Sequence, residues 1–390
     1  MWFFDCPEII YGADALSHLE ELKGERAFIV TDPVLHRLGY TERIAARLAE
    51  AGIAVASFTE VEPEPSLQTV RRGAEQMRGF QPDWIIGLGG GSAMDAAKAM
   101  WVLYERPDLQ PDEISPMVDL NIGKLARLIA IPTTAGTGSE VTWATVLTDL
   151  SDGRKLSLGS RETLPTLAIV DPALTAQLPP RVTVDTGLDA LTHAVEGYIA
   201  TFHNDYTDGL CLKAMQLVFT YLPRAFADGS DEEAREHMAN AATIAGLGFI
   251  NSWASLAHAM GHAFGGHFKV PHGRSVSLFL PYTLEYMAQA SYESRFGDLA
   301  HALRLAVDYT EEAASAAAVI AAIRDLHRQL GQPLTAAEIG IDRDRYEATL
   351  TSLCEFAEGD GTFISGMRVP ERDDLRRLFL AVYDGGVVDW

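Results

Sequence analysis

A strand-like run that ends in three consecutive glycines constrains the fold of this chain most. The apolar run Asp83–Leu88 leads directly into Gly89-Gly90-Gly91-Ser92, and a helix is predicted from Ser92 to Tyr104, with Ser92 as its cap and Asp95 completing a capping box. Glycines at a helix start let the backbone approach an anion, which the free amides and the helix dipole attract. The pattern predicts a phosphate-binding turn, with a plain tight turn as the alternative.

Strand-like and helix-like runs alternate throughout the first half of the chain. Further strands are predicted at Ala27–Asp32, Ile53–Phe58, Leu125–Ile131 and Leu167–Asp171. This alternation predicts a mainly parallel sheet with helices on both faces. Beyond Pro179-Pro180 the pattern is mostly helical, with helices expected over residues 186–201, 208–227 and 231–264 and from Pro281 onward. We therefore expect an α/β dinucleotide-binding domain in residues 1–180 and an all-helical domain in residues 181–390.

Charge and cysteine usage narrow the possible partners. The formal net charge of −23 argues against nucleic acid or an anionic membrane surface as a partner. No apolar run is long enough to span a bilayer, and the first residues lack the features of a signal peptide. Cys6, Cys211 and Cys354 are far apart in sequence, as expected for reduced thiols of a cytoplasmic protein.

A second loop suggests that the bound phosphate belongs to a dinucleotide. Pro132–Glu140 is rich in hydroxyls and glycine and follows another predicted strand. Two such loops at strand ends fit a pyrophosphate better than a single phosphate. Asp32 also ends a strand, where its carboxylate would bind a ribose 2′-OH and repel a 2′-phosphate, favouring NAD over NADP. A helix-capping role is the alternative for Asp32.

Histidines concentrate in one short segment of the second half. Residues 257–273 contain four of the eleven histidines: His258, His262, His267 and His272. His272 follows an expected helix break at Gly265-Gly266 and a proline, where the chain can fold back. Asp189 and His193, spaced i, i+4 on the preceding helix, share one face. Together with His258 and His272, they form a nitrogen and oxygen set that suits Fe²⁺, Zn²⁺, Mn²⁺ or Co²⁺. The alternatives are chance clustering and histidine rings that only make hydrogen bonds inside a core. Asp185 is expected to cap this helix and Glu196 to pair with a neighbour.

Five motifs resemble the iron-containing (group III) alcohol dehydrogenases over nearly the whole chain. They are GGGSAMDAAK (Gly89–Lys98), PTTAGTGSEVT (Pro132–Thr142), AIVDP (Ala168–Pro172), GLDALTHAVEGY (Gly187–Tyr198) and HAMGHAFGGHFKVPHG (His258–Gly273). The resemblance implies the dehydroquinate synthase-like, iron-dependent alcohol dehydrogenase fold, with an active site in the cleft between its domains. It also implies a homodimer, with the N-terminal strand near Trp2–Cys6 pairing across the interface.

The resemblance also implies roles for individual residues. The implied metal ligands are Asp189, His193, His258 and His272, and His262 is the implied proton-relay group beside the nicotinamide. The implied cofactor-binding residues are Asp32, Gly89, Gly90, Gly91, Ser92, Asp95, Thr133, Thr134, Thr137, Thr142 and Lys155. The substrate cavity would include Ala144 and Phe249. His267 is not among the family's ligands, and we expect it to face solvent, with the cleft as the alternative.

Two departures from the family pattern limit what can be carried over. Glu64 stands where members often have Asn, which puts one cofactor contact in doubt. The segment Gly359–Arg368 replaces an Asn-Pro-Arg-type sequence that borders the substrate channel in the family. The substrate preference of other members is therefore not carried over.

The expected reaction is reversible hydride transfer between a primary alcohol or small diol and NAD(P), with NAD favoured. The alcohol oxygen would lie on Fe²⁺, or alternatively on Zn²⁺. A glycerol dehydrogenase-like or dehydroquinate synthase-like enzyme of the same fold is the nearest alternative. A non-catalytic metal- or nucleotide-binding relative is a further one.

Overall fold

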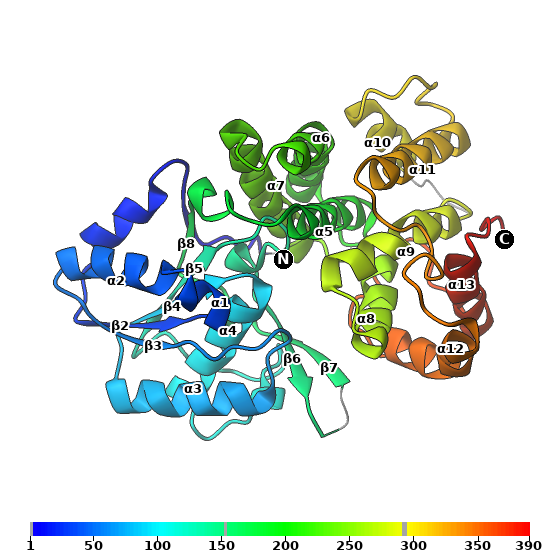
Figure 1. The fold of residues 1–390 in the computed structure, drawn as a ribbon. Helices are drawn as coiled ribbons and strands as arrows, with labels where there is room; N and C mark the ends of the chain where they lie inside the picture. Colours follow the sequence, from blue (N-terminus) through cyan, green and yellow to red (C-terminus); the bar gives the residue numbers. More distant parts are fainter. Residues whose placement is uncertain (1–2, 152–153, 291–294) are drawn as a thin grey trace. The chain divides into compact units, whose positions relative to one another are not determined.

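The computed structural model describes residues 3–151, 154–290 and 295–390 and divides into two compact units, Met1–Gln177 and Leu178–Trp390 (Figure 1). The first unit contains a parallel sheet with helices and the second is helical, which confirms the predicted fold class. Trp2, at the start of the predicted interface strand, lies outside the described residues.

The first unit is built on six parallel strands. They are β1 (Glu8–Tyr11), β2 (Arg26–Val30), β3 (Ala54–Phe58), β4 (Trp84–Gly89), β5 (Arg127–Pro132) and β8 (Leu167–Val170). Their order is β1-β8-β5-β4-β2-β3, and every neighbouring pair is parallel. The chain therefore crosses over between strands, and the carboxyl ends of β4 and β5 lie at one edge of the sheet.

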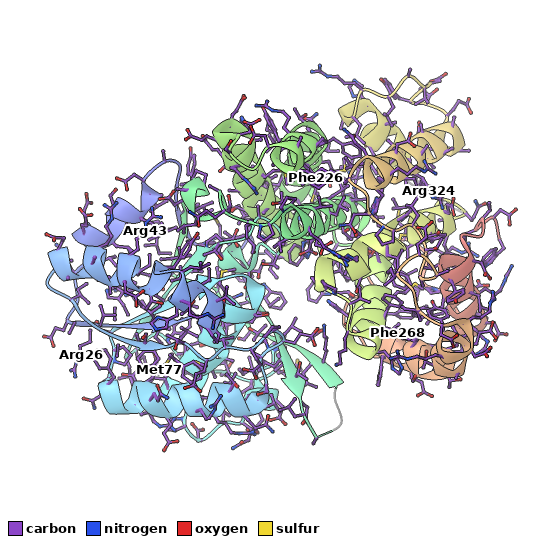
Figure 2. The ribbon with its side chains drawn as sticks, viewed as in Figure 1. Arg26, Arg43, Met77, Phe226, Phe268 and Arg324 are labelled. Carbon is purple, nitrogen blue, oxygen red and sulfur yellow. The ribbon has the colours of Figure 1, made fainter. Side chains whose placement is uncertain are left out.

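Helices cover both faces of this sheet. They are the 3₁₀ helix η1 (Ala15–Glu21) and the α-helices α1 (Pro33–Arg37), α2 (Tyr40–Glu50), α3 (Leu67–Phe80) and α4 (Gly91–Glu105). Successive strand side chains point to opposite faces. Phe28 accordingly packs with α3 and α4, where Met77 is also buried, whereas Ile29 packs with η1 and α2 (Figure 2).

A separate antiparallel hairpin joins β5 to β8 in sequence. It consists of β6 (Ala144–Asp149) and β7 (Arg154–Gly159), with Thr148 opposite Lys155. The sequence pattern did not predict these strands. The hairpin matters for function because it carries Ala144 and Lys155, two of the residues implied for the site.

Nine helices form the described part of the second unit, which contains no strand in residues 178–290 and 295–390. They are α5 (Pro180–Ile199), α6 (Asp205–Ala227), α7 (Glu232–Ile250), α8 (Leu256–Phe268), α9 (His272–Met287), α10 (Phe296–Ala302), α11 (Glu312–Gln329), α12 (Arg343–Glu358) and α13 (Arg372–Asp384). Helix α5 is buried over most of its length and packs against α6, α7 and α9 (Figure 1).

Helix boundaries in this unit differ from the predicted ones. The single helix expected over residues 231–264 is two helices, since α7 ends at Ile250 and α8 begins at Leu256. Helix α8 then continues through the expected glycine break to Phe268, which is labelled in Figure 2. The ring of Phe268 stacks on that of Tyr346 of α12. Among the described residues, no helix combines the length and apolar character needed to cross a membrane.

Candidate metal and nucleotide site

One buried face of α5 carries three functional groups. Asp189, His193 and Glu196 are spaced i, i+4 and i+7, so the helical repeat places them on the same side. All three are buried. The sequence identified the first two as ligand candidates and left the role of Glu196 open.

The start of α9 lies against this face of α5. A Cβ atom on Gly273 would lie 2.1 Å from the backbone oxygen of Asp185, so only glycine permits this approach. Arg274 then donates from Nε and Nη2 to the two carboxylate oxygens of Asp185, at 3.1 and 2.6 Å. Asp185 is therefore not the helix cap that we expected, because α5 begins at Pro180 and Asp185 anchors α9 instead. These contacts bring His272, the first residue of α9, beside Asp189.

The four predicted ligands meet in one cluster. Asp189, His193, His258 and His272 each offer one ligand atom, and these atoms all lie within 4.8 Å of one another. From Oδ1 of Asp189, Nδ1 of His193 lies at 3.8 Å, Nε2 of His258 at 3.9 Å and Nε2 of His272 at 3.2 Å. Three nitrogens therefore surround one carboxylate oxygen.

The chemistry of this cluster fits a divalent metal. Oδ1 of Asp189 and Nε2 of His258 are buried and make no hydrogen bond to the described residues, although buried polar atoms are normally paired. An ion about 2.0–2.2 Å from each ligand would satisfy both atoms. Burial by itself would raise the pKa of Asp189, but the neighbouring His193 and His272 outweigh it and hold that pKa well below its usual range. The carboxylate is therefore ready to bind a cation.

Glu196 orients His258 from the other side of its ring. Nδ1 of His258 lies 2.5 Å from Oε2 of Glu196, which leaves Nε2 directed at the cluster. The same carboxylate accepts from the backbone amide of Ser255 at 3.1 Å and from that of Ala257 at 2.6 Å. A carboxylate at the start of α8 is stabilised by these amides and by the helix dipole. Glu196 thus supplies acceptors for two backbone amides at the start of α8.

His262 lies beside the cluster without belonging to it. Its ring centroid is 5.1 Å from that of His272, and the two rings are stacked. Its Nδ1 lies 2.8 Å from Oδ2 of Asp360, a residue in the segment that departs from the family pattern. Burial would raise the pKa of Asp360, but His262 and hydrogen bonds from Thr362 outweigh it, so that pKa is lowered. The ionised carboxylate accepts a hydrogen bond from Nδ1 and leaves Nε2 of His262 as a proton acceptor.

His267 lies outside the cluster. Its ring meets Phe268 edge-on at 4.8 Å, and the residue is half-buried. Its side chain is therefore less exposed than the sequence led us to expect.

In the first unit, the two predicted phosphate loops lie against each other. The amide of Thr133 donates to the oxygen of Gly89 at 3.0 Å. A Cβ atom on Gly90 would lie 3.4 Å from Oγ1 of Thr134, and one on Gly91 would lie 3.0 Å from Thr137. Gly89 itself has φ +151° and would place a Cβ atom 2.7 Å from Ala93. The glycines therefore permit a tight turn with hydroxyl side chains beside it.

A buried network lies behind these loops. Nζ of Lys98 donates to Oγ of Ser139 at 2.7 Å and to Oγ1 of Thr142 at 3.4 Å. The carboxylate of Asp95 accepts from Ser139 Oγ at 2.8 Å and from the amide of Val146 at 2.9 Å. The predicted capping box is wrong, because Gly90 is the N-cap of α4 and the carboxylate of Asp95 turns to this network. Lys98 ends the GGGSAMDAAK motif, and the sequence alone did not indicate its place in this network.

The remaining predicted cofactor residues have partners within the first unit. Oδ1 of Asp32 accepts from the amides of Val34 and Leu35, so this residue does cap α1. Its second oxygen, Oδ2, lies 3.8 Å from the Cβ position of Gly89, beside the glycine turn. Lys155 forms an ion pair with Glu64.

The two predicted substrate residues belong to different units. Ala144 begins β6, and its backbone oxygen accepts from Nζ of Lys98 at 2.9 Å. Phe249 of α7 stacks on the ring of His193, with 4.1 Å between their centroids. That both face the substrate stays a prediction.

A dinucleotide-type sheet and a buried nitrogen–oxygen cluster in one chain are the features of a metal-dependent enzyme that uses a dinucleotide. Two family models match, one described as iron-containing alcohol dehydrogenase over residues 6–172 and its C-terminal counterpart over residues 183–382. The chain belongs to the iron-containing alcohol dehydrogenase family. It is accordingly an oxidoreductase for NAD(P)-linked alcohol chemistry, and its family implies a divalent metal.

Individual relatives agree with this assignment. The chain is 37% identical to an NADPH-dependent butanol dehydrogenase of Clostridium saccharobutylicum, covering 100% of both chains. It is also 37% identical to aldehyde-alcohol dehydrogenase 2 of Entamoeba histolytica, but there 98% of this chain spans 46% of the longer protein.

Solved structures show the same fold along the chain. An alcohol dehydrogenase from Oenococcus oeni has a TM-score of 0.92 at 30% identity, covering 98% of this chain and all of that one. The iron-containing alcohol dehydrogenase of Thermococcus thioreducens has a TM-score of 0.88 at 32% identity, covering 99% of this chain and all of that one.

Proposed function

We propose that this protein interconverts primary alcohols or small diols and their aldehydes with NAD, using Fe²⁺ or alternatively Zn²⁺ held by Asp189, His193, His258 and His272. The observation that carries this proposal is the convergence of four ligand atoms within 4.8 Å. Two of these atoms are buried without a hydrogen bond to any described residue. Burying these polar atoms without a partner destabilises the folded protein unless a cation binds them.

The side chains divide the chemical work between them. When bound, a divalent metal supplies Lewis acidity, which lowers the pKa of an alcohol and polarises a carbonyl group. Asp189 contributes the negative charge of the ligand set, and Glu196 keeps Nε2 of His258 aimed at it. His262 takes up or returns the alcohol proton at Nε2, directly or through water, while Asp360 holds its Nδ1.

The first unit supplies the site for the dinucleotide. Gly89–Ser92 and the threonines of the second loop would surround the pyrophosphate, with the amides at the start of α4 as donors. Asp32 would bind the adenosine ribose through Oδ2 while Oδ1 caps α1. Its charge favours NAD over NADP, although the butanol dehydrogenase relative is named as NADPH-dependent.

We further propose that the protein is a cytoplasmic homodimer. Its cysteines are free thiols in the structure, which supports a reducing compartment. Family membership supports a small-molecule alcohol or aldehyde as its substrate. Light scattering on the purified protein measures the oligomeric state, and a monomeric mass would contradict the dimer.

One experiment tests the central proposal. The protein is purified anaerobically, its metal content is measured, and NAD- and NADP-linked activity is assayed on a panel of alcohols, diols and aldehydes. We expect about one divalent metal per chain and net NADH formation from primary alcohols, which a lyase of this fold would not give. Asp189→Asn serves as the control and should lose metal and activity together. An active, metal-replete Asp189→Asn protein would refute the ligand assignment.

A further inference from the structure

An ion pair lies beside the glycine turn of the first unit. Nζ of Lys155 lies 2.6 Å from Oε1 of Glu64. The Lys155 side chain is 11% exposed and that of Glu64 34% exposed, so the pair is partly withdrawn from solvent. Charges in such a position are screened by salt less than charges on an open surface.

Two contacts hold Glu64 between the turn and the hairpin. Its backbone amide donates to Oγ of Ser92, the second residue of α4, at 3.3 Å. The next residue, Pro65, accepts from the amide of Thr148 at 2.8 Å, and Thr148 is paired with Lys155 across the hairpin. The carboxylate of Glu64 is therefore fixed near both the phosphate turn and the lysine.

The backbone at Glu64 is unfavourable for this residue type. Glu64 has φ +59°, in the left-handed region where glycine and asparagine are tolerated better than glutamate. The chain thus keeps a strained glutamate where a smaller residue would fit the backbone. The ion pair with Lys155 is the favourable interaction that the glutamate side chain adds and that can offset this strain.

We infer that Glu64 sets the affinity of the protein for its dinucleotide by competing with the pyrophosphate for Lys155. This inference rests on the proposed function, because it takes Gly89–Ser92 as the pyrophosphate site. A lysine ammonium beside a phosphate site attracts the anion, and an adjacent carboxylate both neutralises that cation and repels the phosphates. Glu64 therefore weakens binding and hastens release of the reduced cofactor.

The test measures NADH binding to the intact protein by fluorescence titration. Glu64→Gln removes the charge but keeps the length of the side chain. We expect it to lower the Kd for NADH about three- to tenfold at low ionic strength, and this gain should shrink as salt is added. Glu60→Gln is the matched control, because Glu60 lies in the same loop but pairs with the exposed Arg72. It should leave the Kd unchanged.

A double-mutant cycle locates the effect. In a Lys155→Met background, Glu64→Gln should give a clearly smaller gain, because the competition for Lys155 has been removed and only the direct repulsion of the phosphates is left. Weaker NADH binding in the single variant Glu64→Gln would overturn the inference and mean that Glu64 itself bonds the cofactor. An unchanged Kd would overturn it as well. A wild-type protein that binds neither NADH nor NADPH would instead contradict the proposed function.

Discussion

Glu196 and His258 share a hydrogen bond of 2.5 Å between Oε2 and Nδ1, and this bond fixes which nitrogen of the imidazole faces Asp189. The carboxylate belongs to α5 and the imidazole to α8. Carboxylates that orient a histidine ligand in this way hold its ring in place and raise its basicity toward a metal. The support of the cluster is thus built into the same helix as two of its candidate ligands.

Glu196→Gln is expected to weaken metal binding about 10- to 100-fold, because it removes the charge that orients His258. The affinity is measured by competition with a chelator of known strength. Glu236→Gln, an exposed position on α7, is the control. Unchanged metal affinity in a folded Glu196→Gln protein would mean that this residue only anchors the start of α8.

Asp360→Ala is expected to lower kcat about tenfold while metal content and the KM for NAD stay unchanged, because His262 loses the acceptor that orients it. His262→Ala should be more severe and should also keep its metal. Asp360→Asn retains an acceptor and should restore part of the rate. Thr362→Ala removes only the hydrogen bond from the hydroxyl to Oδ1 of Asp360 and leaves Oδ2 on His262, so an equal loss there would point to a structural role.

Asp32→Asn is expected to raise the ratio of kcat/KM for NADP to that for NAD by about tenfold or more, because it removes a negative charge facing a 2′-phosphate. Asparagine is also a good helix cap, so the start of α1 should be kept and the melting temperature should barely change. If the ratio of kcat/KM for NADP to that for NAD is unchanged, Asp32 acts only as the cap of α1.

The buried Lys98 is expected to make the free energy of unfolding rise with pH in the alkaline range. Burial lowers its pKa to about 8 from 10.5, although Asp95 and Glu140 partly oppose the shift. Between these two pH values the folded protein has released the proton and the unfolded chain has not. The contribution of this group to stability therefore rises with pH across that window, by about 3 kcal/mol.

Comparison with Lys98→Met isolates this contribution from other titrating groups. Urea unfolding at pH 7 and pH 10 should show the wild type gaining stability relative to the variant at the higher pH. If the wild type instead loses stability relative to the variant between pH 7 and pH 10, the folded protein stabilises the charged form of Lys98. The variant should be less stable at both values, since Ser139 and Thr142 lose a donor.

Local spacing explains which parts of the site were predictable. Asp189 and His193 lie four residues apart on one helix, so the helical repeat alone pairs them. Asp360 lies far along the chain from His262, and only the packing of α8 brings the two together. Glu64 and Lys155 belong to a loop and a hairpin, and no periodic pattern links them.

The two glycines expected to end α8 illustrate a limit of sequence patterns. The helix continues through Gly265 and Gly266 to Phe268. A Cβ atom on Gly261 would lie 2.7 Å from Val276, and one on Gly265 would lie 2.8 Å from Ser275. Glycine here permits close packing of α8 on α9, and only the partner helix distinguishes this role from that of a helix breaker.

All four candidate ligands come from the second unit, as do Glu196, which orients His258, and Asp360, which contacts His262, whereas the phosphate loops come from the first. The protein can therefore lose its metal without losing the ability to bind the nucleotide. A preparation stripped of its metal in air is expected to keep its affinity for NADH. Its activity should then return on adding the metal alone, which offers a practical route for recovering inactive material.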